Sequence, residues 1–412
     1  MRLAFLNNLF PPYIVGGNEM LAHEVIGALR DRGHEVHALV GRGSKLPQDG
    51  FTHGVIDIDL DRKADYFLGA RQPSAWEHVE WHLFNYRTYR DVRSKLLEIK
   101  PDLVVVWNLW VASMAPLIAA RRTGIPLVIH TADRWLYYGL KDWRPLVGTQ
   151  NPRKRRIADF LQMRLQPILF SLARPKPIIT ISEFIRRVYI EAGFDGSAIE
   201  AIRLGVPLNV FNNSNRTSSQ DGCIRFLYVG SLWEGKGAHF AIRALGILKG
   251  KPGLPKLELN FYGSGTSDFM NFLQEEIRVA GVEKIVRFHG FVDRLSLPDT
   301  FRKHDVLLFP SVWEEPFAAV PVEAMACGMA VIATTAGGTP EAIEDGRTGI
   351  LVPPQDVHAL SKAMERLILD DALRHRLGEE AAQVARERFD FNSYVDRLEK
   401  RYSELAGVSV HS

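Results

Sequence analysis

The chain has 412 residues, more than one hydrophobic core usually supports, so we expect two domains. Hydrophobic residues make up 46% and charged residues 24% of it, as in ordinary globular proteins, and the formal net charge of only +3 argues against nucleic acid as a partner. Two cysteines are too few for a disulfide framework, and no apolar run reaches the roughly 18 residues of a membrane span. The first residues fit a strand rather than a signal peptide, so we expect a cytoplasmic protein.

The first half alternates short apolar runs with amphipathic stretches, which is the pattern of a parallel sheet covered by helices. We predict an irregular segment from Gly41 to about Ser74, a helix from Trp76 to Ile99, and a helix from Arg153 to Leu172 that is interrupted near Pro167. Ser182 is expected to cap a further helix. Strands are predicted at Leu3–Leu6, His34–Val40, Asp102–Trp107, Pro126–His130, Pro177–Ile181 and Ile199–Arg203, and other helices at Asn18–Arg32 and Ala112–Arg122.

A polar run, Asn212–Gly222, precedes a second half with the same alternation. Its strands are predicted at Arg225–Val229, Leu257–Tyr262, Ile285–Phe288, Val306–Phe309, Ala330–Ala333 and Gly349–Leu351, and the chain is mostly helical from Val357 to about Leu405. These patterns predict an α/β protein with two doubly wound, Rossmann-like domains. We place the domains at residues 1–205 and 223–389, with a linker at 206–222 and a C-terminal segment at 390–412.

The second half contains a conspicuous pair of glutamates after the buried strand Val306–Phe309. Pro316 suits the first turn of a helix, and Gly328 suits its end. Glu315 would then lie at the mouth of this helix and Glu323 two turns inside, roughly 12 Å away, because each helical residue adds 1.5 Å. That separation matches a ligand with two hydroxylated ends joined by a diphosphate. The amides of Phe317, Ala318 and Ala319 would point at the diphosphate.

This stretch resembles the signature of glycosyltransferase family 4, in which a Glu is followed, after seven residues, by a second Glu. Glu315, Phe317, Glu323 and Ala324 match, whereas Ala318 replaces the usual Gly and brings a methyl group close to the phosphate path. The resemblance implies a GT-B architecture, with the domains facing a cleft, and a retaining hexosyltransferase that needs neither metal nor cofactor. It also implies polysaccharide or glycolipid synthesis.

The same resemblance implies what each domain binds. The second domain would hold a nucleoside-diphosphate sugar, and the first would hold a sugar or lipid-linked sugar acceptor. The C-terminal segment would cross back to the first domain. Residue patterns leave UDP and GDP undistinguished, because the family reads the base through main-chain groups.

Individual roles follow from the family motifs. Glu315 would hold the hydroxyls of the transferred sugar and Glu323 the ribose. Lys236 would neutralise the diphosphate, and its removal should leave the melting temperature almost unchanged; Ser231 stands where the family has Arg. His130, at the end of a strand, would face the cleft near the sugar. The resemblance implies three catalytic residues, His130, Lys236 and Glu315. It implies a donor site formed by Gly16, Gly17, Ser231, Lys236, Glu315, Phe317, Ala318, Ala319, Val320 and Glu323. It implies acceptor contacts from Asp133 and Arg134.

Three alternatives stay open at this stage. Asp57, Asp59 and Asp61 alternate with apolar residues, which would put them on one face if this segment were extended, as either a divalent-metal site or a polar strand face. The basic segment 153–176 either docks peripherally on the inner face of the membrane or forms a solvated helix surface. The whole chain could instead be a sugar-nucleotide epimerase of the same architecture, or a non-catalytic nucleotide-sugar-binding protein.

Overall fold

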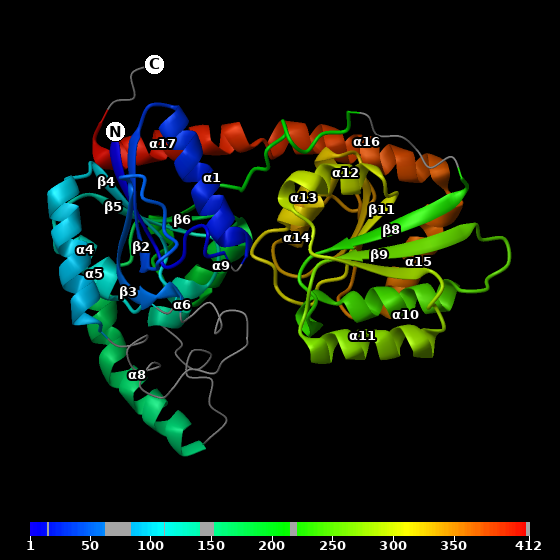
Figure 1. Ribbon diagram of the computed structural model, residues 1–412, viewed down its shortest axis with the longest axis horizontal. Coiled ribbons are helices and arrows are strands. Elements are labelled where there is room, and N and C mark those ends of the chain that lie inside the picture. The colour runs from blue at the N-terminus through cyan, green and yellow to red at the C-terminus, as the bar shows by residue number, and fades with distance from the viewer. Residues whose placement is uncertain (15, 62–83, 111, 141–151, 215–220, 409–412) are drawn as a thin grey trace. The chain divides into compact units, whose positions relative to one another are not determined.

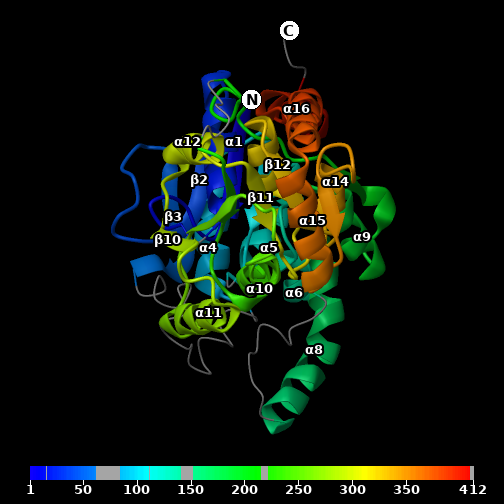
Figure 2. The same cartoon turned by 90° about the vertical axis from the view of Figure 1, so that its right-hand side faces the viewer.

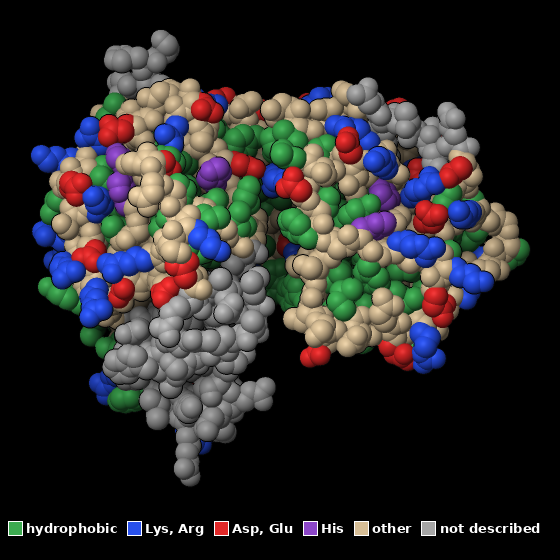
Figure 3. Space-filling view, viewed as in Figure 1, with side chains coloured by type: hydrophobic (Ala, Val, Ile, Leu, Met, Phe, Trp, Pro, Cys, Tyr) green, Lys and Arg blue, Asp and Glu red, His purple; other side chains and the backbone are tan. Residues whose placement is uncertain are grey.

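The computed structural model describes the chain except for residues 15, 62–83, 111, 141–151, 215–220 and 409–412 (Figure 1). The chain forms two compact units. The first contains residues 1–181, 185–202 and 395–412, and the second contains residues 182–184 and 203–394. Among the described residues, we find no helix with the length and apolarity that crossing a bilayer requires. Basic and acidic side chains are interspersed on the face shown in Figure 3.

The first unit is built on a seven-stranded parallel sheet with the strand order β3-β2-β1-β4-β5-β6-β7. The order runs outward from β1 in both directions, which is the doubly wound arrangement predicted from the sequence. The strands are β1 (Arg2–Asn7), β2 (Glu35–Arg42), β3 (Thr52–Asp59), β4 (Leu103–Asn108), β5 (Leu127–Thr131), β6 (Ile178–Thr180) and β7 (Ile199–Ala201).

The helices of this unit are α1 (Gly17–Asp31), α4 (Tyr86–Ile99), α5 (Ala115–Arg121), α6 (Trp135–Leu140), α8 (Pro152–Ala173), α9 (Glu183–Glu191), the short η1 (Gly196–Ala198) and most of α17 (Phe391–Ala406). Much of the predicted helix Trp76–Ile99 before Phe84 lies outside the described residues. In the described part, α4 begins at Tyr86, where the Asn85 side chain caps it by accepting a hydrogen bond from Thr88 N. The predicted break near Pro167 is wrong, since α8 continues through that residue; a proline removes one backbone donor without having to end a helix.

The second unit has a six-stranded parallel sheet with the order β10-β9-β8-β11-β12-β13. Its strands are β8 (Cys223–Val229), β9 (Lys256–Tyr262), β10 (Val286–Gly290), β11 (Val306–Phe309), β12 (Ala330–Thr334) and β13 (Ile350–Val352). The helices are η2 (Glu234–Lys236), α10 (Ala238–Leu248), α11 (Ser267–Ala280), η3 (Arg294–Ser296), α12 (Leu297–Arg302), α13 (Ala319–Ala326), α14 (Thr339–Ala342), α15 (Val357–Leu369) and α16 (Asp371–Arg388).

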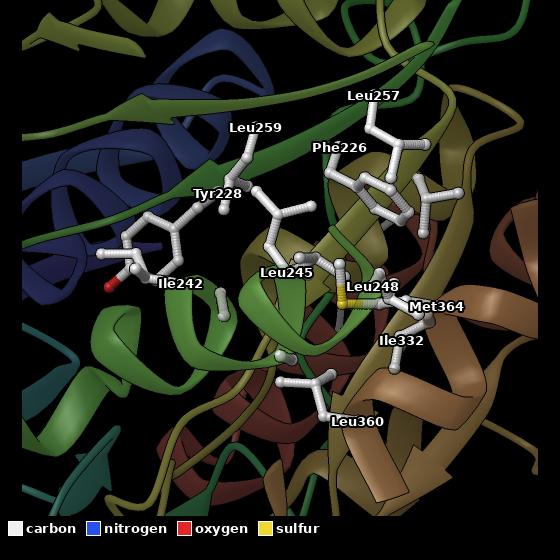
Figure 4. Close-up of a cluster of buried hydrophobic side chains, with 14 of the residues drawn as sticks. Phe226, Tyr228, Ile242, Leu245, Leu248, Leu257, Leu259, Ile332, Leu360 and Met364 are labelled. Atoms are coloured by element: carbon white, nitrogen blue, oxygen red, sulfur yellow. The ribbon is translucent and has the colours of Figure 1, made fainter. Parts of the chain in front are cut away.

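Helices cover both faces of this second sheet (Figures 1 and 2). Helices α10, α11 and α15 pack together on one face, and α12, α13 and α16 on the other. The core between α10, α15 and the sheet contains Phe226, Leu259, Leu245 and Met364 (Figure 4). This core fixes β8 beside β11, so the loops that leave the carboxyl ends of these two strands emerge next to each other.

Candidate active site

The centre of the candidate site in the second unit is an ion pair between Lys236 and Glu315. Lys236 follows β8 and Glu315 follows the neighbouring β11, which explains how residues far apart in sequence meet. Lys236 Nζ lies 2.7 Å from Glu315 Oε1, and Ser311 Oγ donates a hydrogen bond to the same oxygen at 2.7 Å. The Glu315 side chain is only 7% exposed. A buried carboxylate is therefore held by one cation and one hydroxyl.

A glycine pair after β12 fixes the backbone of Glu315. Gly338 N donates a hydrogen bond to Glu315 O at 2.7 Å. Gly337 has φ +61°, and a Cβ atom there would lie 2.4 Å from both Glu315 N and Glu315 O, so only glycine fits. The next residue, Thr339, is fully buried, and its hydroxyl has no hydrogen-bond partner among the atoms that the structure describes.

Helix α13 differs in detail from the sequence expectation. It begins at Ala319 rather than at Pro316, so Pro321 is its third residue and lies in the first turn, where a missing N–H costs little. Glu323 is consequently one turn, not two, inside the helix, and the 12 Å estimate does not apply. The Ala319 backbone N–H donates a hydrogen bond to Phe317 O at 3.1 Å. This amide is therefore not available for a diphosphate, contrary to the prediction.

The other predicted donor residues near α13 and β8 have varied environments. Ala318 is fully buried and Phe317 packs against Phe389, so the extra methyl group of Ala318 lies inside the protein. Val320 is half-buried. Ser231 is exposed, and its carbonyl oxygen accepts a hydrogen bond from Tyr228 Oη at 3.0 Å. Burial raises the pKa of Tyr228, and the nearby Glu315 carboxylate adds to the rise.

Glu323 has a partner that the sequence analysis missed. Arg294 Nη2 lies 3.1 Å from Glu323 Oε1, and the Glu323 side chain is nearly fully buried. Arg294 opens η3, just beyond β10, and its guanidinium lies 5.7 Å from the ring centroid of Phe211. The available signal was an arginine a few residues beyond the predicted strand Ile285–Phe288. Ser311 was also missed, although it is a polar residue placed immediately beyond a buried strand.

The first unit gathers polar side chains at the carboxyl ends of β1, β4 and β5. Gly16 N donates to Glu19 Oε2 at 2.8 Å, and Gly17 is the first residue of α1. Asp133 Oδ2 accepts hydrogen bonds of 3.3 Å from both Asn18 and Asn108.

Burial raises the pKa of Asp133 to about 6; the Trp135 backbone N–H opposes this rise, and the nearby Glu19 carboxylate adds to it. Arg134, beside Asp133, is half-buried. The predicted acceptor residues thus lie in a polar cluster together with Gly16, Gly17 and two asparagines.

His130 is deeper than predicted. It is fully buried in β5, its ring centroid is 4.2 Å from that of Trp107, and its Nδ1 lies 2.9 Å from the Tyr402 hydroxyl. The expectation of an open position was wrong, because α17 brings Tyr402 over the end of β5. Burial lowers the pKa of His130 to about 3, so the ring is neutral at physiological pH.

The three aspartates near β3 have protein partners. Asp57 lies 3.7 Å from an Arg42 guanidinium nitrogen, and Asp61 accepts hydrogen bonds from Tyr13 and Ser44. Within the described part of the chain, no cluster of three or more potential metal-ligating side chains was found. Asp57 and Asp59 belong to β3, whereas Asp61 lies beyond its end, so the predicted strand face does not include all three carboxylates.

Two family models together match nearly all of the chain. Residues 15–210 match the model described as Glycosyltransferase Family 4, and residues 209–384 match the model described as Glycosyl transferases group 1.

The chain belongs to glycosyltransferase family 4.

Relatives of this family 4 chain differ in what they are named for. The glycogen synthase of Mycobacterium tuberculosis is 26% identical over 98% of the chain and 94% of its own length. The D-inositol 3-phosphate glycosyltransferase of Streptomyces avermitilis is 34% identical over 67% of the chain and 60% of its own length. The chain is therefore a glycosyltransferase, and the epimerase alternative is set aside.

Solved structures show that this family 4 chain has the GT-B fold. Sucrose-phosphate synthase from Thermosynechococcus elongatus aligns with a TM-score of 0.75 and 17% identity, covering 99% of the chain and all of that structure. The Anabaena protein HepE, solved in complex with UDP and glucose, aligns with a TM-score of 0.69 and 22% identity, covering 98% of the chain and all of that structure.

Proposed function

We propose that this glycosyltransferase moves a hexosyl group from a nucleoside-diphosphate sugar to a hydroxyl acceptor, with retention of configuration and without a metal ion. The observation that carries the proposal is the Lys236–Glu315 pair at the carboxyl ends of β8 and β11. Such a pair offers a cation for the departing diphosphate and, next to it, a carboxylate for sugar hydroxyls. The fold binds its ligands at this edge of a sheet.

Each charged group then has one task. Lys236 neutralises the diphosphate as it leaves, while Glu315 accepts hydrogen bonds from the transferred sugar. Glu323, fixed by Arg294, binds the ribose. UDP is the first nucleotide to test, since HepE was solved with it.

The reacting hydroxyl group of the acceptor would bind to the first unit. Asp133, Arg134, Gly16 and Gly17 lie at the carboxyl ends of its strands, in a cluster rich in hydrogen-bonding groups. His130 lies beneath this cluster and would act by shaping it, because the ring is neutral and fully buried. Ser231 in place of the usual arginine favours one second candidate, a member of this family that binds the donor but has lost the transfer reaction.

Calorimetry with two glutamate variants tests the donor site. UDP should stabilise the wild type by about 2.7 kcal/mol at a hundredfold excess over its dissociation constant. Glu323→Ala should weaken UDP binding, since its expected partner is on the nucleotide. Glu315→Ala should reduce turnover of the sugar donor more than it reduces UDP affinity, since its expected partner is on the sugar. Equal loss of UDP affinity in both variants contradicts the assignment, and so does a wild type that binds neither UDP nor GDP. A wild type that binds UDP-sugar without transfer or hydrolysis favours the binding protein.

We also propose a peripheral contact with anionic lipid through α8. Phe160, Met163 and Ile168 are each more than half exposed on this helix, which also carries the exposed Arg156 and Arg164. Figures 1 and 2 show its N-terminal part projecting away from the sheet of the first unit. Exposed apolar side chains interspersed with arginines are typical of helices that lie on a membrane surface.

Sedimentation with vesicles tests this contact. The protein should bind vesicles that contain phosphatidylglycerol, and the binding should fall steeply with added salt. Phe160→Ser combined with Met163→Ser should abolish binding, whereas Val279→Ser, at an exposed apolar position on α11, should not. If the protein binds neutral vesicles equally well, or binds neither kind, the lipid contact is contradicted and α8 is a solvated surface helix.

A further inference from the structure

Two exposed tryptophans lie beside the Lys236–Glu315 pair. Trp233 is three residues before Lys236 and Trp313 two residues before Glu315, and they are 41% and 42% exposed. Their ring centroids are 5.7 Å apart with an angle of 64° between the ring planes. Both belong to the second unit. Exposed aromatic surface next to a binding site usually has a function, because leaving it in water costs free energy.

Both loops are held in place by the same residue. Gly235 O accepts hydrogen bonds of 2.9 Å from the backbone N–H groups of Val312 and Trp313. Gly235 also lies directly under the Trp233 ring, since a Cβ atom at that glycine would be 2.2 Å from the ring. The two indoles are thus carried on loops that are bonded to each other. A preformed aromatic surface binds its ligand with a small loss of conformational entropy.

The charged residues next to the two tryptophans indicate which kind of ligand the tryptophans bind. Glu234 and Glu314, the sequence neighbours of Trp233 and Trp313, are both exposed. Carboxylates accept hydrogen bonds from hydroxyl groups, and their charge disfavours a phosphate that has no cation such as Lys236 beside it. Indole faces pack against the apolar C–H face of a sugar ring by burying it from water. Aromatic rings flanked by carboxylates therefore suit a neutral carbohydrate.

We infer that Trp233 and Trp313 form a platform that binds sugar residues of a neutral oligosaccharide acceptor. The inference rests on the proposed function, because it places the acceptor chain beside the proposed donor site. Two indoles at a steep angle present two faces, which fit successive residues of a glycan better than one small acceptor. A phosphorylated acceptor would instead bring its negative charge to Glu234 and Glu314.

Binding of neutral glycans to matched variants tests the platform. The probes are oligosaccharides of four to seven residues from α-1,4-glucan, β-1,4-glucan and α-mannan, measured by calorimetry with the full chain. We expect the wild type to bind at least one series, with affinity that rises with chain length. Trp233→Ala and Trp313→Ala should each weaken this binding at least fivefold, and the double variant at least thirtyfold. Trp313→Phe should retain part of the affinity, since it keeps an aromatic face.

Two controls separate this inference from protein damage and from the proposed function. Phe272→Ala removes an aromatic ring of similar exposure on α11 and should leave glycan binding unchanged. UDP affinity measured on every variant reports whether the donor site is intact. Wild-type protein that binds UDP but none of the oligosaccharides overturns the platform, as does a double variant with undiminished glycan affinity. Failure to bind any nucleotide contradicts the proposed function instead.

Discussion

At the scale of single residues, the pairing of Lys236 with Glu315 changes what Lys236 does in the free protein. The sequence alone predicts that removing Lys236 leaves the melting temperature almost unchanged. The structure places it 2.7 Å from a carboxylate that is almost fully buried. Removing one partner of a buried ion pair leaves the other charge without compensation, which is costly. Lys236 therefore has a structural role before any ligand binds.

Lys236→Ala should accordingly destabilise the free protein by roughly 1–3 kcal/mol, less than a fully buried pair would cost because the lysine is partly exposed. Glu315→Gln removes the charge that needs compensation, so the double variant should be less destabilised than the sum of the single variants. Urea unfolding of the four proteins at pH 7.5 measures this coupling. Additive changes would mean that the two side chains do not interact in solution.

His130 makes a prediction about pH. Its pKa is lowered by burial to about 3 in the folded chain, against roughly 6.5 in an unfolded one. Between these two pH values His130 is protonated in the unfolded chain but not in the folded one. The contribution of His130 to the free energy of unfolding is therefore complete above about pH 6.5 and is lost as the pH falls toward 3. The loss from this residue approaches about 1.4 kcal/mol per pH unit.

His130→Gln removes the titrating group and tests that prediction. The free energy of unfolding of the wild type minus that of His130→Gln should decrease as pH falls from 7 to 4.5. Other titrating groups are common to both proteins and largely cancel in this difference. A difference that stays constant across the range would contradict a depressed pKa at His130.

Sequence patterns predicted some of these residues and not others, for a physical reason. Glu315 and Lys236 belong to local motifs at the ends of strands, so their neighbourhood can be recognised within a few residues. Arg294 and Tyr402 reach Glu323 and His130 from elements far away in the sequence. Such contacts depend on how helices pack, and no local pattern encodes them.

At the scale of elements, strand positions followed from hydrophobicity wherever a strand is buried on both faces. Strand β11 has the predicted bounds, and its four residues are all buried. Strand β3 was predicted as irregular because, at the edge of its sheet, only alternate residues are buried and its apolar pattern is weak. The start of α13 was misplaced because two prolines, Pro316 and Pro321, each fit a first turn.

The glycine loop after β12 permits a matched pair of variants. Gly337→Ala forces a left-handed residue to carry a Cβ 2.4 Å from the Glu315 backbone. Gly346→Ala, at φ +75° with open space around it, carries the backbone strain alone. We expect Gly346→Ala to lower the free energy of unfolding by about 1–2 kcal/mol, and Gly337→Ala to lower it by clearly more. Only Gly337→Ala should also lose transfer activity. If thermal unfolding shows the same loss of stability in both variants, the Cβ atom at position 337 does not clash with the Glu315 backbone.

At the scale of the whole molecule, the end of the chain completes the first unit. Residues 395–412 belong to that unit, although residues 203–394 form the second. Glu399 is 2.7 Å from both Arg32 and His34, and Arg401 is 2.9 Å from Glu200. Tyr402 is fully buried against His130. The first sheet consequently depends on residues that follow the second unit in the sequence.

Deleting residues 395–412 should therefore unfold or loosen the first unit and spare the second. Loss of one large buried side chain such as Tyr402 already costs about 3–5 kcal/mol, and the ion pairs of Glu399 and Arg401 are lost with it. Hydrogen exchange followed by mass spectrometry separates the two units. Amides of β5 should exchange much faster in the truncated chain, while those of β11 keep their protection. A chain ending at residue 408 retains these contacts and is the control. Equal protection of β5 in both truncated chains would show that α17 is dispensable for the first unit.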